Sequence, residues 1–149
     1  MNSPTPSNPI TVDEVKATAE RFWRIVQGGG PGREAAPIFA AGGLIAPDGT
    51  WLDLEAHQAL HRDLRDESHH WESIELEALC DDPPRVFVVA SVGWRATTRA
   101  TDERIDAVVG QRWLLERRPD GSLRFNGWWS NSIEYRPGSA VPGGLRPRR

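Results

Sequence analysis

Residues 108–133, VVGQRWLLERRPDGSLRFNGWWSNSI, decide the fold, because they read as two strands joined by a tight turn. Pro119 presets the backbone angle of the second turn position, Asp120 suits the third, and Gly121 readily takes the left-handed conformation that follows. This order predicts a type I turn closed by a glycine bulge. The segment is therefore expected to form a β-hairpin whose register is set by its turn.

The predicted register sorts the side chains of the hairpin onto two faces, because residues alternate along a strand. With Arg118 opposite Ser122, Trp113 faces Gly127 and Gln111 faces Trp129. The face expected to line a core or pocket then carries Gln111, Trp113, Leu115, Leu123, Phe125, Trp129 and Asn131. The opposite face carries Arg112, Leu114, Glu116, Arg124, Asn126, Trp128 and Ser130.

Composition and charge exclude several classes of function. The chain has 149 residues, which suits one domain with a sizeable core, and a net charge of -3. Its basic residues are spread along the chain, so no nucleic-acid partner is expected. The single cysteine, Cys80, can form no internal disulfide and indicates a reducing compartment. With no signal-peptide pattern and no apolar run of membrane-spanning length, we expect a cytoplasmic protein without a membrane partner.

Three helical segments are expected before the long strands. Thr11 and Glu14 have the spacing of a capping box, so a helix should begin there, after a disordered segment at residues 1–10. A short second helix should cover about residues 33–41, and Asp53 can cap a third that ends near Asp66. The apolar face of the first helix is formed by Val12, Val15, Ala19, Phe22 and Val26.

Four strands are expected next, over about residues 70–80, 85–98, 104–117 and 123–135. Helices followed by antiparallel strands predict an α+β fold, in which the helices pack on one face of a curved sheet and leave a cavity between the layers. We expect one domain over residues 11–136 and a flexible tail over 137–149. The inner face of the second strand should carry Val86, Val88, Ala90, Val92, Trp94 and Ala96.

This order of elements resembles the nuclear transport factor 2-like superfamily, which has a cone-shaped, cystatin-like fold, and more narrowly its polyketide-cyclase-like (SnoaL-like) branch. The resemblance rests on the opening helix with Phe22 and Trp23, the bend at residues 48–49 and the hairpin around residues 113–121. It implies a ligand or active site inside the cone. It also implies a homodimer formed through the outer sheet faces, with Trp128 as a contact.

Helix-borne histidines are the candidate catalytic residues. The period of the third helix places His57 and His61 on its apolar side, where an imidazole facing a water-poor cavity can act as a general base. They can equally be structural, hydrogen-bonded inside the core. A metal would need a third ligand, such as His70 or Glu72, and the segment lacks the glutamate of a His-Glu-x-x-His motif, so neither metal nor cofactor is expected. The adjacent pair His69 and His70 is expected to be solvated at the edge of a loop; if one of the two points inward, strand parity favours His70.

A ligand pocket is expected between the helices and the sheet. Its wall should be aromatic and poor in carboxylates, with Asn131 or Gln111 as a donor to a substrate carbonyl. The superfamily that the chain resembles includes steroid isomerases and epoxide hydrolases, but the residues here depart from both patterns. Tyr135 lies too late in its strand for steroid-isomerase chemistry. Asp106 and Arg112 are expected on the outer face, where they cannot perform epoxide-hydrolase chemistry. The ligand-binding residues are expected to be Phe22, Val92, Trp94, Gln111, Trp113, Phe125 and Trp129.

Three functions remain open from the sequence. The first is a small-molecule-binding cone domain with a pocket for an apolar or aromatic molecule. The second is a lyase, isomerase or cyclase that uses His57 or His61 as its base. The third is a dimerisation or partner-binding module whose cone is filled by its own side chains.

Overall fold

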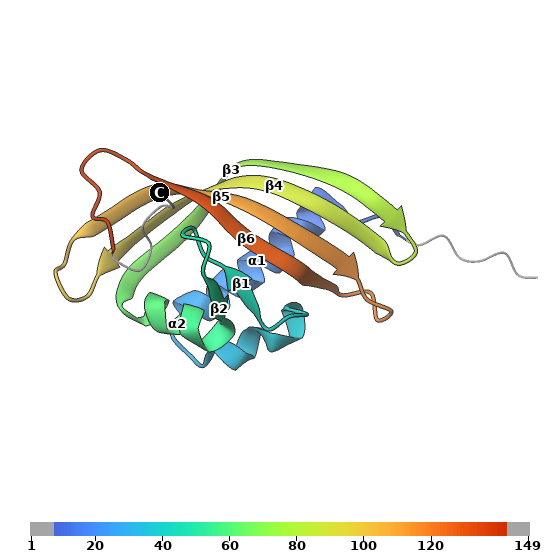
Figure 1. Cartoon of the computed structure of the whole chain (residues 1–149), viewed down its shortest axis with the longest axis horizontal. Coiled ribbons are helices and arrows are strands. Elements are labelled where there is room, and N and C mark those ends of the chain that lie inside the picture. Colours follow the sequence, from blue (N-terminus) through green and yellow to red (C-terminus); the bar gives the residue numbers. More distant parts are fainter. Residues whose placement is uncertain (1–7, 143–149) are drawn as a thin grey trace, which may run out of the picture.

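The structure, a computed structural model, describes residues 8–142 of the chain. Four long strands form a curved sheet that arches over two helices and a short hairpin (Figure 1). The order along the sheet is β2-β1-β6-β5-β4-β3. In chain order the elements are α1 (Val12–Gln27), the 3-10 helix η1 (Gly32–Ile38), β1 (Gly43–Ile45), β2 (Trp51–Asp53), α2 (Leu54–Arg62), β3 (Leu64–Asp81), β4 (Pro84–Thr98), β5 (Arg104–Arg117) and β6 (Leu123–Tyr135).

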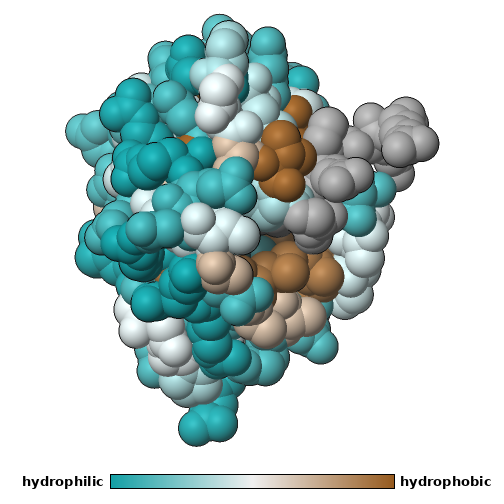
Figure 2. Space-filling model, turned by 90° about the vertical axis from the view of Figure 1, so that its left-hand side faces the viewer, coloured by the Kyte–Doolittle hydropathy of each residue, from teal (hydrophilic) through white to brown (hydrophobic). Residues whose placement is uncertain are grey.

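The α+β architecture expected from the sequence is confirmed, with helices packed on one face of a curved sheet. The disorder expected at the start of the chain and the flexible tail fall largely on residues 1–7 and 143–149, which lie outside the described residues. No helix between residues 8 and 142 is both long and apolar enough to cross a membrane. Seen from the end where β4 turns into β5, the surface is mainly hydrophilic and has a few apolar areas (Figure 2).

Both helix starts follow the capping signals. Thr11 accepts a hydrogen bond from the backbone N–H of Glu14 through its side-chain oxygen, 3.2 Å away. Asp53 does the same for the N–H of Ala56, at 2.7 Å. However, α2 ends at Arg62 rather than near Asp66, and β3 begins earlier than expected, because the chain turns there into extended backbone.

The turn between β5 and β6 forms as the sequence predicts. The N–H of Gly121 donates to the carbonyl oxygen of Arg118 at 2.9 Å, and the N–H of Arg118 donates to Ser122 at 2.8 Å. Gly121 has a φ of +89°, the left-handed conformation that favours glycine. Counting back from this turn in the predicted register places Leu115 opposite Phe125, and the two residues do pair.

Beyond that pair, two bulges in β6 overturn the predicted register. The first leaves Asn126 as an extra residue, so Trp113 pairs with Trp128 rather than with Gly127. The second leaves Asn131 as an extra residue, so Gln111 pairs with Ser130. Each extra residue shifts the alternation of side chains by one position.

The bulges exchange which side chains of β6 face the core. The inward positions predicted for Trp129 and Asn131 are wrong, since both residues are exposed on the outer face. The outward position predicted for Trp128 is also wrong: this indole is 4 % exposed and lies in the core. The ring of Trp129 instead lies across Gly127, where an added Cβ would come within 2.4 Å of it.

A bulge in β3 has the same effect on the paired histidines. The register of β3 against β4 shifts between Trp71 and Ser73. The ring of His70 therefore lies on the outer face over Gly93, and His69 is the residue that turns inward. The inward placement of His70 predicted from strand parity is wrong, because one extra residue separates it from the inward Ile74.

Aromatic side chains form the centre of the core. Trp113 is fully buried. Its ring centroid lies 4.6 Å from that of Trp128, 5.6 Å from Phe125, 5.9 Å from Trp71 and 6.4 Å from Trp23. A second, smaller cluster, which includes Leu64, Trp94, Ile105 and Ile133, fills the end of the sheet near the β4–β5 turn. These clusters bury the inner face of the sheet.

Substitution of the two indoles separates core from surface. We expect Trp113→Ala to lower the free energy of unfolding by about 3 to 5 kcal/mol, since it deletes a fully enclosed side chain. Trp129→Ala should cost about 1 kcal/mol or less, since Trp129 is on the outer face. Urea denaturation of both variants measures the difference. Equal losses would contradict the bulged register.

Candidate ligand pocket and its histidine cluster

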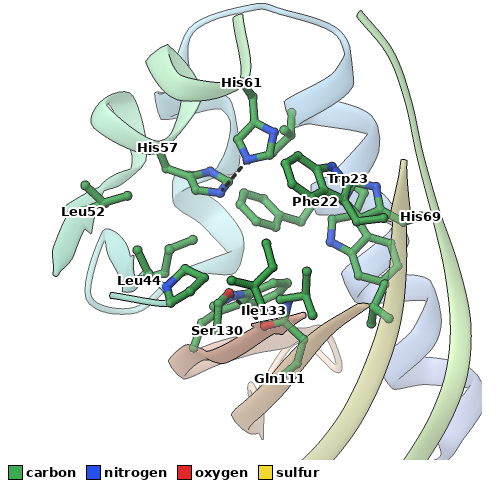
Figure 3. Close-up of a pocket in the computed structure, with 17 residues that line it drawn as sticks. Phe22, Trp23, Leu44, Leu52, His57, His61, His69, Gln111, Ser130 and Ile133 are labelled. Atoms are coloured by element: carbon green, nitrogen blue, oxygen red, sulfur yellow. Dashed lines mark hydrogen bonds between the residues drawn. The ribbon is translucent and has the colours of Figure 1, made fainter. Parts of the chain in front are cut away.

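A cavity lies where the two core clusters meet, between α1, α2, the β1–β2 hairpin and the inner face of the sheet (Figure 3). The cavity has a volume of about 60 Å³, within a hollow whose empty space, including its open mouth, is about 620 Å³. Its wall combines an apolar majority with five polar side chains. The apolar residues are Phe22, Trp23, Val26, Leu44, Ala46, Pro47, Leu52, Val92, Trp94, Val109, Trp128 and Ile133, and the polar ones are His57, His61, His69, Gln111 and Ser130.

The structure brings together most of the residues that the sequence singled out. Six of them lie in the cavity wall: Phe22, His57, His61, Val92, Trp94 and Gln111. Two others, Trp113 and Phe125, face inward but belong to the packed core beside the cavity. Trp129 and Asn131 lie on the opposite face of the sheet, so they are not part of this wall.

The two helix-borne histidines contact each other. His57 and His61 lie one turn apart on α2, and their Nε2 atoms are 3.1 Å apart (Figure 3). The ring of His57 also stacks against Phe22, with centroids 5.5 Å apart and an interplanar angle of 26°. The apolar side of the helix therefore presents both imidazoles to the cavity, as its period indicates.

Glu67 is a buried carboxylate that the sequence reasoning missed. Its Oε2 atom lies 2.9 Å from Nδ1 of His61 and accepts a hydrogen bond from Nε1 of Trp94 at 3.0 Å. Glu67 fell in an expected loop between a helix ending near Asp66 and a strand beginning near His70. Its two-residue spacing from His69 was the signal that both side chains share the inner face.

Hydrogen bonding keeps Glu67 ionised despite its burial. Burial alone would raise the pKa of this carboxyl, but the hydrogen bond and charge of His61 and the hydrogen bond from Trp94 outweigh it. The pKa of Glu67 is therefore below its ordinary value. A buried carboxylate in this setting needs such partners.

His57 is held uncharged. Burial lowers the pKa of its ring well below the usual value, and the neighbouring His61 and His69 lower it further. Its Nδ1 atom is buried and has no hydrogen-bond partner within the described residues. An unpaired buried nitrogen costs stability, so His57 is the imidazole of the cluster whose hydrogen bonding is incomplete.

His69 faces the same cavity from the sheet. Its ring stacks on Trp23 with centroids 4.6 Å apart and an interplanar angle of 2°, and its Nδ1 lies 3.1 Å from the amide nitrogen of Gln27. Because the amide nitrogen donates, Nδ1 accepts. Burial lowers the pKa of His69 to about 4. The negative charge of Glu67 opposes this shift, and repulsion from His61 and His70 adds to it.

Gln111 presents an amide donor at the floor of the cavity. Its Oε1 accepts hydrogen bonds from Ser130 Oγ at 3.0 Å and from Trp113 Nε1 at 3.3 Å. Ser130 in turn accepts from Trp128 Nε1 at 3.1 Å. These donors fix the orientation of the amide, and no described residue accepts a hydrogen bond from its Nε2. Gln111 is therefore suited to donate to a ligand oxygen, the role that the sequence also proposed for Asn131.

No metal site is assembled from these groups. Among the described residues, no three or more His, Cys, Asp and Glu side chains are arranged to hold a metal ion. Glu72 and His70, the third ligands considered from the sequence, lie on the outer face and contact each other at 3.0 Å. What the cavity offers is acid–base and hydrogen-bonding chemistry.

Comparisons with solved structures show the fold. Aln2 from a Streptomyces species matches with a TM-score of 0.61 and 23 % identity, over 86 % of this chain and 94 % of that one. A cystatin-like protein from Caulobacter vibrioides matches with a TM-score of 0.61 and 16 % identity, over 84 % and 89 %. A protein from Novosphingobium aromaticivorans assigned as a scytalone dehydratase matches with a TM-score of 0.57 and 14 % identity, over 91 % of each chain. No family model and no curated protein matches the sequence.

The chain thus has the cone-shaped cystatin-like fold, shared with nuclear transport factor 2-like proteins, that its order of elements resembles. The homodimer stays a prediction, although its expected contact changes: Trp128 is buried inside the cone. The outer face carries Trp129, 37 % exposed, and Trp51 on β2, 51 % exposed.

The buried neutral His69 predicts a loss of stability in acid. Its pKa is about 4 in the folded protein and about 6.5 when unfolded, so the unfolded chain binds more protons as the pH falls between these values. The contribution is fully present above pH 6.5 and falls by about 3 kcal/mol by pH 4. We expect His69→Gln to flatten this part of the profile of unfolding free energy against pH. His70→Gln, on the outer face, is the control, and an unchanged profile in His69→Gln would contradict the assignment.

Proposed function

We propose that the chain binds a small, uncharged, largely apolar molecule in the cavity beneath the sheet. The observation that carries this proposal is the composition of the cavity wall: it is mostly aromatic and aliphatic and includes no lysine or arginine among the described residues. The polar groups in it, the amide of Gln111 and neutral imidazoles, can recognise a carbonyl or hydroxyl group without charge. An anionic ligand would lose its hydration without gaining a cationic partner.

The size of the cavity limits the ligand. At about 60 Å³ the enclosed part holds only a few water molecules, so a larger ligand extends into the open mouth of the hollow. The flat walls offered by Trp23, Trp94 and Trp128 suit a planar ring. Tryptophans in the wall also make binding visible by fluorescence.

A matched pair of probes tests the proposal. At pH 7.5 we expect 2-naphthol to quench tryptophan fluorescence in a saturable way, and 2-naphthoate, similar in size but charged, to bind at least about tenfold more weakly. Val109→Phe, which places a larger side chain in the cavity wall, should weaken quenching by 2-naphthol, whereas Trp129→Phe should leave the affinity unchanged. No saturable quenching by 2-naphthol or other neutral aromatic probes would overturn the proposal.

We propose as a second function that the pocket catalyses proton transfer, as a lyase, isomerase or cyclase of the polyketide-cyclase-like branch would. The specific observation in its favour is the contact between His57 and His61, backed by the carboxylate of Glu67. Gln111 is then the donor to the substrate oxygen. The solved structure assigned as a scytalone dehydratase supports this at the level of the fold alone.

Proton exchange provides an assay that needs no natural substrate. We expect the wild-type protein to accelerate exchange of the benzylic α-protons of 2-tetralone, a neutral aromatic ketone, in D₂O, as followed by NMR. His57→Gln should slow the catalysed exchange by at least about 100-fold, the usual contribution of a general base. Thermal unfolding of the same variant is the control. Unchanged exchange in folded His57→Gln would contradict a basic role for His57.

A further inference from the structure

Glu67 lies behind the two pocket histidines and determines where their protons sit. Its side chain is 4 % exposed, and Trp94 Nε1, which can only donate, occupies one of its oxygens. Because the carboxylate is ionised, it is an acceptor on both oxygens. Nδ1 of His61, 2.9 Å from Oε2, must therefore carry a proton and donate it.

The position of the proton on His61 determines its position on His57, one turn earlier in α2. A neutral His61 protonated on Nδ1 has a bare Nε2, which accepts from the Nε2 of His57, 3.1 Å away. His57 must then carry its proton on Nε2, and its Nδ1 holds a free lone pair. That nitrogen is the buried atom without a partner among the described residues.

We propose that His57, His61 and Glu67 form one acid–base unit that takes up a single proton, with the positive charge residing on His61 and with His57 neutral in both states. Glu67 is the positioning residue of this unit. The inference deepens the second proposed function and rests on it for the identity of the proton donor: an uncharged molecule with an acidic C–H or O–H group.

The proton balance of the unit is simple. A proton that leaves the bound molecule forms an N–H bond at Nδ1 of His57, and the electron pair of the broken bond stays on that molecule. The proton on Nε2 of His57 shifts to Nε2 of His61 along their hydrogen bond. His61 becomes an imidazolium paired with the Glu67 carboxylate, and His57 ends as the other neutral tautomer.

The surroundings of the unit favour this distribution of charge. His57 stacks on Phe22, and burial disfavours a charged ring there, whereas His61 has a carboxylate at 2.9 Å. Among the described residues that line the cavity, the only other titratable group is His69, on β3. No charged or titratable side chain in the part of the cavity wall that the structure describes comes from α1, β1, β2, β4, β5 or β6. His69 stays neutral down to about pH 4, where its pKa lies.

The arrangement lets His57 act first as an acceptor and then as a donor without itself becoming charged, while the negative charge resides on the bound molecule. Its Nδ1 is bare before the transfer and protonated after it, so the same atom can return the proton to another position of the bound molecule. Such a step moves a proton within one molecule or removes water from it. The positive charge that forms stays on His61, behind His57 and beside Glu67.

NMR of the ¹⁵N-labelled imidazoles in the ligand-free wild-type protein tests the proposal directly. At pH 7.5 we expect His57 protonated on Nε2 and His61 on Nδ1. When the unit takes up its proton, His61 should be the imidazolium, and His57 should change tautomer and stay neutral. A His61 protonated on Nε2 at pH 7.5, or a charge appearing first on His57, would overturn it.

Glu67→Gln gives the matching variant. We expect His61 to lose its preference for protonation on Nδ1, because the acceptor that fixes it is gone, and the tautomer preference of His57 to relax with it. Glu72→Gln is the control: it changes the same residue type on the outer face of β3, beside His70. It should leave the tautomers of His57 and His61 unchanged.

The readout separates this inference from the proposed functions. If the tautomers are as stated but no neutral aromatic molecule binds, the acid–base unit stands and the proposed ligand falls. If 2-naphthol binds while the tautomers differ, the pocket stands and the unit falls. Circular dichroism of Glu67→Gln confirms folding, and should that variant not fold, the wild-type titration decides alone.

Discussion

The structure depends on the packing of Trp113 against the aromatic rings around it. A curved sheet of four long strands exposes one large apolar face, which must be covered for the chain to fold. Trp23 from α1 and Trp128 from β6 both pack against Trp113. This contact sets how closely α1 approaches the sheet. The cavity is left at the junction of the two core clusters, where α2 covers the sheet instead.

Features determined by neighbouring residues could be predicted from the sequence. Thr11, Asp53 and Gly121 each act within four residues of their own position, through a cap or a turn, and each does in the structure what its residue type favours. The helical period likewise placed His57 and His61 on the cavity side of α2. Local chemistry was sufficient for these elements.

Features that depend on contacts across the sheet could not be predicted in this way. A strict alternation assigns every side chain of β6 from the turn onward, so the bulge at Asn126 reverses the later assignments until the second bulge at Asn131 restores them. The ring of Trp129 lies where a Cβ of residue 127 would be, so this position suits glycine. No local sequence pattern reveals that contact. The role of Glu67 could not be predicted for a related reason. It depends on the exact residue at which α2 ends, and sequence patterns place that residue only to within a few positions.

The two bulges of β6 have a consequence for how such a cavity can change in evolution. Side chains on this strand are assigned to the inside or the outside by counting, and each extra residue changes the count by one. Deletion of Asn126 would leave Phe125 and Trp128 separated by one residue, the spacing of regular alternation, so Trp128 would still face the cavity. A single codon can therefore be gained or lost at a bulge while the wall keeps its indole and its hydroxyl, so the length of this strand can vary without a change of ligand preference.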